Sequence, residues 1–346
     1  MANPSLQIGN SNWAIKEDNL LGYSTAGTRF VPQPITMTRE SAGTRVNSSG
    51  LVETVELLGS EDVVNGSFST DSDWDKAPSG VTINGGSANF NSASDTYIYQ
   101  DILTTTKTYK IIFSGTINSG SLYIGENGVA TNTYTAGTYT NEVAYFTVAS
   151  SSRFIIRKTG VGTLDATIDN VSVKESTKNN LARVDYDGTA SSLLVEPERT
   201  NVFIQNDIST WNGFSSYAGN TTAPDGTTIN FVNMEDRRIF PTTTIINSTE
   251  YTSSIYLKGN KTADVKLRNV SGNDTVITLS TEWQRFELTA TSVSTVTNTL
   301  LIDARFSQGM GVSGLEVAVY GGQTEVGSYP TSYIPTDGGT VTRVQD

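Results

Sequence analysis

One short segment, SDTYIYQD at residues 94–101, places aromatic and polar side chains at a spacing that could bind a ligand. If the segment is a strand, Tyr97 and Tyr99 lie on the same side of it, with Gln100 and Asp101 close by. Aromatic rings cover the apolar face of a pyranose, and neighbouring amides and carboxylates bind its hydroxyls. Together with Tyr123, these four residues are therefore candidate carbohydrate-binding residues. The alternative, that the rings pack in the core or in an oligomer interface, stays open.

The side chains that many enzymes use for nucleophilic or metal chemistry are missing. The sequence has no His and no Cys, which excludes Ser-His and Cys-His catalysis, His-ligated zinc, thiolate metal sites and disulfides. It has 35 Asp and Glu residues. A glycosidase needs two carboxylates across a cleft, but with so many acidic residues some pair always lies close enough, so this signal has no specificity. We predict that the chain is not an enzyme.

Charge and hydropathy limit the partners. The formal net charge of −12 argues against nucleic acid, because phosphate binding needs a positive surface. No apolar run approaches the roughly 20 residues of a membrane span, so we expect no membrane insertion. The first residues also lack a basic stretch followed by an apolar one, so we expect no secretory signal.

The central part of the chain has the period-two pattern of half-buried strands. In TYKIIFSGTI, Tyr109, Ile111 and Phe113 alternate with polar side chains such as Lys110. Similar segments recur about every 10 to 15 residues, separated by Gly, Ser and Asn, with no helical pattern between them. Residues 59–176 are therefore predicted to form a β-sandwich.

The same plan recurs further along the chain. EYTSSIYLKGN repeats the pattern of TYKIIFSGTI after a shift of about 140 residues, so that Tyr251 stands for Tyr109. Trp74 and Trp211 stand near the start of the two units. We predict that a second β-sandwich occupies residues 201–346, and that the fold is all-β with two tandem jelly rolls.

The segments outside the sandwiches do not look like domains. Residues 1–58 carry scattered apolar side chains, and Pro32 and Pro34 hold the backbone extended, so we expect an extended N-terminal arm that needs another surface to order it. Residues 177–200 are predicted to be a connector. The stretch YPTSYIP, with two prolines and alternating tyrosines, should run extended and seal the second sandwich.

Three long elements carry a resemblance to a known family. MTRESAGTRVNSSGLVETV, LLVEPERTN and YGGQTEVGSYPTSYIPTDGGTVTR resemble, in the same order, elements of tailed-phage and prophage virion proteins. The unit between the first two, with VVNGSFSTDSDW and IDNVSVKE, resembles carbohydrate-binding-module-like (concanavalin-like) jelly rolls. The resemblance spans nearly the whole chain.

This resemblance implies a structural protein of a phage virion, such as a tail fibre, a tail appendage or a capsid-surface fibre or decoration. The arm would dock to other virion proteins, and the jelly rolls would project outward as a homo-oligomer that contacts host-surface glycans. The protein would be made in the host cytoplasm and reside on the virion. The alternative is an enzyme, a polysaccharide depolymerase or glycosidase that acts on host capsule or exopolysaccharide.

Two further expectations come with the resemblance. Jelly rolls of this type often hold a structural calcium ion with hard oxygen ligands, and Asn65 and Asp169 stand at fitting places, so calcium is the one cofactor to expect. The three family elements also belong to one scaffold, so we predict that the arm, the connector and the C-terminal segment meet in space. The first jelly roll would then be inserted into that scaffold.

Overall fold

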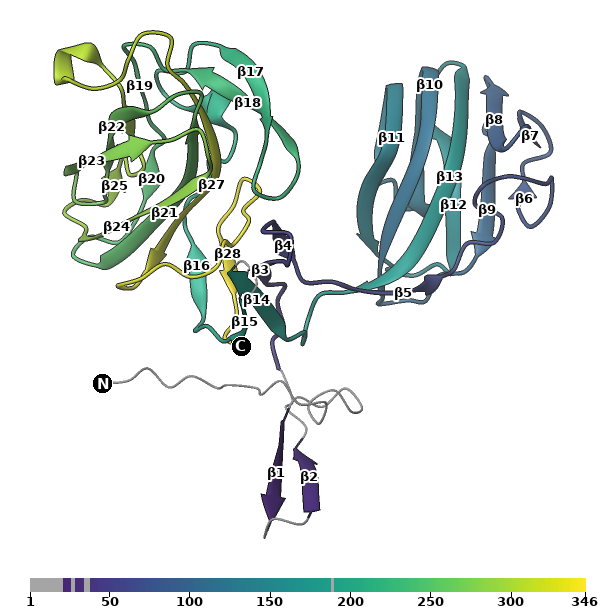
Figure 1. Cartoon of the computed structure of the whole chain (residues 1–346). Coiled ribbons are helices and arrows are strands. Elements are labelled where there is room, and N and C mark those ends of the chain that lie inside the picture. Colours follow the sequence, from purple (N-terminus) through teal and green to yellow (C-terminus); the bar gives the residue numbers. More distant parts are fainter. Residues whose placement is uncertain (1–20, 26–28, 34–37, 188–189) are drawn as a thin grey trace. The chain divides into compact units, whose positions relative to one another are not determined.

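The computed structural model describes residues 21–25, 29–33, 38–187 and 190–346, and in these residues the protein is nearly all β (Figure 1). The predicted all-β class is confirmed. The described part of the chain has no α-helix, and so no helix able to cross a membrane; it has short 3-10 turns, η2 (Ile208–Thr210) and η3 (Phe306–Gln308). Residues 1–20, 26–28 and 34–37 of the predicted arm lie outside the described residues.

The chain divides into two compact units. One is Glu56–Lys178, which we call the inserted sandwich, and the other combines Met1–Val55 with Asn179–Asp346, which we call the scaffold. The sequence patterns predict a first sandwich at residues 59–176 and a separate connector at residues 177–200. In the structure residues 38–55 of the arm and residues 179–200 of the connector belong to the same unit as the second sandwich, while residues 56–58 and 177–178 belong to the inserted sandwich.

All residues of the inserted sandwich are described, and its strands form one nine-stranded sheet that folds into two layers. The strands are β5 (Leu57–Glu61), β6 (Asp75–Lys76), β7 (Val81–Asn84), β8 (Ser87–Ser92), β9 (Tyr97–Asp101), β10 (Thr108–Glu126), β11 (Thr133–Thr147), β12 (Arg153–Thr159) and β13 (Leu164–Thr177). The first part of β10 pairs with β13 and its last part pairs with β12, so this strand runs from one layer into the other. Tyr109, Ile111 and Phe113 of β10 are buried in the core, as the alternation predicted.

The scaffold has smaller sheets. Its strands are β1 (Leu21–Thr25), β2 (Arg29–Gln33), β3 (Thr44–Val46), β4 (Val52–Thr54), β14 (Arg183–Asp187), β15 (Ala190–Leu194), β16 (Arg199–Asn201), β17 (Tyr217–Thr222), β18 (Thr228–Asn233), β19 (Arg238–Ile239), β20 (Thr243–Thr244), β21 (Glu250–Gly259), β22 (Ala263–Arg268), β23 (Asp274–Leu279), β24 (Gln284–Thr291), β25 (Val296–Thr297), β26 (Ile302–Asp303), β27 (Glu316–Val326) and β28 (Val341–Arg343). A five-stranded sheet, β17-β18-β27-β21-β24, and a four-stranded sheet, β19-β26-β22-β23, supply the side chains of one apolar core.

The two units share one pairing order, which supports the predicted duplication. In the inserted sandwich the order β7-β8-β13-β10-β11 corresponds to β17-β18-β27-β21-β24 of the scaffold. The other layer, in which β9 pairs with β12 and β12 with the end of β10, corresponds to β19, β26 and β22. Strand β10 is thus equivalent to β21 followed by β22, which the scaffold separates at residues 260–262.

Matched side chains occupy the same places in both units. The buried Tyr109 hydroxyl accepts a hydrogen bond from the Thr104 backbone N–H at 3.0 Å, and Tyr251 accepts one from Ile246, also at 3.0 Å. Trp74 and Trp211 are both buried, and each indole N–H donates to a backbone carbonyl, at 3.1 Å and 2.8 Å respectively. Both tryptophans therefore have the structural role that burial of an indole with a satisfied N–H indicates.

Candidate functional site

Strand β9 presents the predicted aromatic pair on the outer face of its layer. Tyr97, Tyr99 and Asp101 alternate with the fully buried Ile98, and the two tyrosine rings lie 6.1 Å apart between centroids. The neighbouring strand β12 adds Arg153, which faces Asp101 in the register, and Arg157, which faces Tyr97. We call Tyr97, Tyr99, Asp101, Arg153 and Arg157, with the adjoining Asp95, the tyrosine face.

Two guanidinium groups organise the tyrosine face. Arg157 donates two hydrogen bonds to the Asp95 carboxylate, at 2.9 Å and 2.7 Å, and Arg153 donates to Asp101 at 3.0 Å. The Arg153 guanidinium also lies 3.6 Å from the centroid of the Tyr99 ring, a cation–π contact that holds this ring in place. The hydrogen bonds from Arg157 lower the pKa of Asp95. The face therefore combines fixed aromatic rings with charged donors and acceptors.

Gln100 does not belong to this face, which corrects the sequence prediction. Because side chains alternate along a strand, Gln100 points to the opposite side from Tyr99. It is only 7% exposed, and its amide binds the Val64 backbone in both directions, with Oε1 accepting at 3.1 Å and Nε2 donating at 2.7 Å. Gln100 thus fixes the loop before β6 and is buried away from the tyrosine face.

Tyr123 is also unsuited to a direct contact. Tyr123 lies on β10 and pairs in register with Arg157 of β12. Its side chain is buried, and its hydroxyl accepts a hydrogen bond from the Gly128 N–H at 3.4 Å. Tyr123 therefore points to the same side of the sheet as Arg157 and Tyr97, but it is covered by other side chains. The sequence prediction of the binding residues did not include Arg153 and Arg157. Their spacing of four within SRFIIRKT nevertheless places both on one side of a strand.

The two predicted calcium ligands make local hydrogen bonds. The Asn65 amide nitrogen donates to the carbonyls of Thr70 and Ser72, at 2.8 Å and 3.0 Å, and its oxygen accepts from the Ser69 N–H. Asp169 accepts from the N–H of the next residue. The carbonyls that could ligate a cation thus already bind an amide N–H, and no group of three acidic side chains suited to a metal occurs among the residues described. This donor set does not fit calcium, and calcium stays a prediction of the resemblance.

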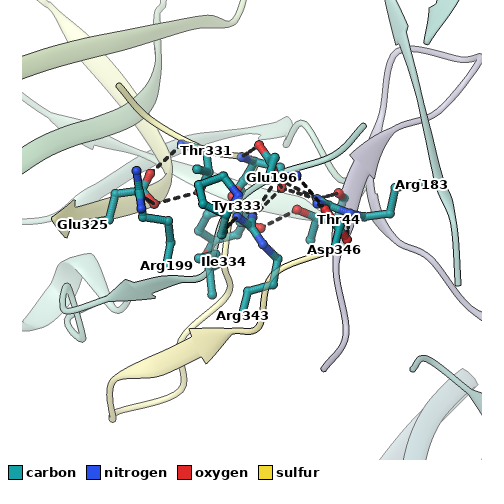
Figure 2. A network of polar contacts seen from close by, with 12 residues as sticks. Thr44, Arg183, Glu196, Arg199, Glu325, Thr331, Tyr333, Ile334, Arg343 and Asp346 are labelled. Atoms are coloured by element: carbon teal, nitrogen blue, oxygen red, sulfur yellow. Dashed lines mark hydrogen bonds and ion pairs between the residues drawn. The ribbon is translucent and has the colours of Figure 1, made fainter. Parts of the chain in front are cut away.

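The three family elements meet in a buried polar network within the scaffold, as predicted (Figure 2). From the arm, the fully buried Arg39 pairs with the buried Asp346 carboxylate at 2.5 Å. From the connector, Arg183 pairs with the same carboxylate and, at 2.8 Å, with Glu196. From the C-terminal segment, Arg343 pairs with Glu196 at 2.9 Å. Residues up to 307 apart in sequence are thereby held together.

The stretch TSYIP lies against this network by polar bonds as well as by packing. Thr331 donates its N–H to Glu325 at 2.6 Å, and Ile334 donates to the Gln323 side chain, also at 2.6 Å. The Thr44 hydroxyl of β3 donates to the Tyr333 carbonyl. The charged side chains of this network thus bind one another and the neighbouring backbone and hold these segments together, so the network is a structural site.

The network makes the stability of the scaffold depend on pH. Burial raises the pKa of Asp346, but hydrogen bonds and charge from Arg183 and Arg39 outweigh it, so this pKa lies below the ordinary 3.8. Burial also raises the pKa of Glu196, but the charge of Arg343 and hydrogen bonds from Ser332 and Arg183 outweigh it, so this pKa lies below the ordinary 4.5. A lowered carboxyl pKa adds stability that is complete above the ordinary value and is lost as the pH falls through the folded-state value.

We therefore expect the melting temperature of the scaffold to be steady near neutral pH and to drop as the pH falls below about 4. Thermal unfolding followed by circular dichroism across this range measures the effect. The variant Asp346→Asn should melt at a lower temperature at neutral pH and show a shallower acid drop. An acid drop identical in the variant and the parent chain would contradict this assignment.

No family model and no curated protein match the chain. Among solved structures it is similar to the tandem CBM22-1-CBM22-2 domain of Paenibacillus barcinonensis Xyn10C, with 9% identity, a TM-score of 0.24 and coverage of 78% of this chain and 98% of that one. It is also similar to the M60 catalytic domain with CBM51-1 and CBM51-2 of Clostridium perfringens ZmpB, with 8% identity, a TM-score of 0.24 and coverage of 84% and 43%. A third is the cycloalternan-forming enzyme of Listeria monocytogenes in complex with pentasaccharide substrate, with 12% identity, a TM-score of 0.23 and coverage of 85% and 29%. TM-scores this low do not establish a shared fold.

Proposed function

We propose that the chain is a non-enzymatic structural protein of a phage virion, a tail fibre, tail appendage or capsid-surface decoration, that contacts host-surface glycans. The resemblance of its three scaffold elements to phage virion proteins supports the virion assignment. The proposed arm docks to other virion proteins through the residues before Arg39, because residues 39–55 are already bound into the scaffold. The sandwiches then project outward, as a homo-oligomer.

The observation that carries glycan contact is the tyrosine face. Tyr97 and Tyr99 lie side by side on the solvent-facing side of a rigid sheet, with an arginine–carboxylate pair next to each ring. The rings supply an apolar platform for the C–H face of a pyranose, and the charged pairs supply acceptors and donors for its hydroxyls. A sheet holds such groups in place before the ligand arrives, which favours affinity.

The alternative, a depolymerase, fits this face less well. A glycosidase needs a carboxyl group with a raised pKa to protonate the leaving oxygen. On the tyrosine face the hydrogen bonds from Arg157 lower the pKa of Asp95, and Asp101 is bonded to Arg153. Asp95 is thereby suited to accept hydrogen bonds and not to donate a proton, which supports binding without turnover.

We expect the double variant Tyr97→Ala/Tyr99→Ala to lose at least about tenfold in affinity for the surface polysaccharides that the parent chain binds, since tenfold corresponds to about 1.4 kcal/mol of lost stacking. A microarray of bacterial surface polysaccharides followed by titration of the hits measures it. Tyr145→Ala is the matched control, because Tyr145 is a partly exposed tyrosine on β11, in the other layer. Equal binding by the double variant would contradict the role of the face, and release of reducing sugar would favour the depolymerase.

A further inference from the structure

We propose that the scaffold holds a second saccharide site, a tyrosine-lined groove on the outer face of its five-stranded sheet, which takes a neutral sugar. The groove consists of two adjoining hollows, of about 380 Å³ and about 150 Å³, that share Thr44, Val52 and Tyr333. All of its lining residues belong to the scaffold. The inference rests on the proposed function in one respect, the choice of a saccharide as ligand.

Three tyrosine rings form the floor of the groove. Tyr256 of β21 and Tyr320 of β27 face each other across the two strands, with ring centroids 5.9 Å apart, and Tyr333 lies 5.5 Å from Tyr320. The register of β21 and β27 shifts at this point, and Gly321 has a φ of 62°, which a glycine adopts without strain. A Cβ at Gly321 would lie 3.2 Å from the Tyr256 ring. The backbone is therefore shaped so that the three rings come together.

The wall of the groove is held in place independently of any ligand. The hairpin of β3 and β4 supplies this wall, and its Val52 N–H donates to the Pro224 carbonyl at 2.7 Å. Its Thr44 hydroxyl donates to the Tyr333 carbonyl, so the hairpin is fixed to the floor as well. A hollow built in this way is already formed in the free protein, as most small-molecule sites are.

Arg285 adds a positive charge to the lining of the smaller hollow. Its guanidinium donates to the Ser254 hydroxyl at 2.9 Å and to the Thr331 carbonyl at 2.7 Å, and it lies 5.5 Å from the Tyr256 ring centroid. These contacts fix the guanidinium beside the Tyr256 ring, so its charge is held in place before a ligand arrives.

The lining selects a neutral saccharide. Sugar hydroxyls both donate and accept, so they match the carboxylates of Glu53 and Asp225 as well as Arg285, while the rings match the C–H face of a pyranose. Burial and the Asp225 carboxylate raise the pKa of Tyr333 to about 12, so its hydroxyl stays protonated at neutral pH. Acidic side chains outnumber arginines in the lining, which disfavours uronic acids and other anionic sugars.

The test uses the full chain with the tyrosine face removed, Tyr97→Ala/Tyr99→Ala, and saturation-transfer NMR with four probes: maltopentaose, cellopentaose, laminaripentaose and an acidic oligogalacturonate. We expect at least one neutral probe to bind, and the additional change Tyr320→Ala or Thr54→Trp to weaken it at least about tenfold. Thr54→Trp fills the larger hollow from its rim and keeps the floor intact. Tyr217→Ala, at an exposed tyrosine that does not line the groove, is the matched control and should leave binding unchanged.

The outcomes separate the two sites. If the parent chain binds neutral probes and the face variant binds none, the groove proposal is wrong and the tyrosine face alone carries the function. If Tyr320→Ala and Thr54→Trp bind as tightly as the face variant itself, or if oligogalacturonate binds more tightly than every neutral probe, the groove proposal is also wrong. If the parent chain binds no probe and no surface polysaccharide, both proposals fail.

Discussion

Replacing Arg183 with alanine is expected to lower the free energy of unfolding of the scaffold by about 3–5 kcal/mol, the usual loss when one partner of a buried ion pair is removed. The Arg183 side chain is fully buried, and it pairs with both Asp346 and Glu196. It also donates to the Thr44 carbonyl at 3.1 Å and to the Ser332 hydroxyl at 2.7 Å. The change would leave two carboxylates buried with fewer donors and would loosen the contact between connector, arm and C-terminal segment.

Hydrogen exchange measured by mass spectrometry, as a function of urea, can follow the two units separately. We expect protection in Arg183→Ala to fall across peptides of residues 38–55 and 179–346 and to persist in residues 56–178. The control is Arg153→Ala, which breaks a half-exposed ion pair of the inserted sandwich and should cost about 1 kcal/mol or less. A loss below about 1 kcal/mol for Arg183→Ala would mean that the network does not hold the scaffold together.

Replacing Gly66 with alanine is expected to destabilise the inserted sandwich by on the order of 3 kcal/mol, a large effect for one methyl group. A Cβ at Gly66 would lie 1.9 Å from the Val171 carbonyl oxygen, which is a backbone atom and has no rotamer to change. The Val171 N–H donates to the Gly66 carbonyl at 2.8 Å, so moving the two segments apart would break this bond. The neighbouring Asn65 carbonyl accepts from the Trp74 indole and would move with it.

The same hydrogen-exchange experiment measures the effect of Gly66→Ala, which is expected in the inserted sandwich. Protection in Gly66→Ala should fall in residues 56–178 and remain in the scaffold. Gly137→Ala on β11 is the matched control, because a Cβ there meets Tyr139 only at 3.6 Å or more, an ordinary contact. Unchanged protection of the inserted sandwich in Gly66→Ala would show that this loop does not pack on β13 as described.

Local patterns in the sequence were sufficient for the strands and their faces. Alternation put Tyr109 and Phe113 in the core, and it put Tyr97 and Tyr99 together on an outer face. The same rule, applied strictly, would have placed Gln100 on the opposite side from the tyrosines, so this error was avoidable. The pattern of the Tyr109 segment, repeated around Tyr251, also predicted two similar units, and these share one strand-pairing order.

What the sequence could not supply is contact between distant segments. The pair of Arg39 and Asp346 joins residues 307 apart, and no local pattern specifies such a partner. The groove has the same origin, since Thr44 of β3, Asp225 and Tyr320 of β27 come together only after the sheets have formed. The family resemblance indicated that the three elements belong together, but the atoms that join them follow from the three-dimensional structure.

The virion assignment is tested most directly by finding the protein on intact particles. Purified virions from a phage that encodes this chain would be labelled with gold-conjugated antibodies against the inserted sandwich and imaged by electron microscopy. We predict gold at a regular position on the tail or on the capsid surface, and its absence from particles whose chain begins at residue 38. Unlabelled virions, with the chain recovered only from the soluble lysate, would contradict the account.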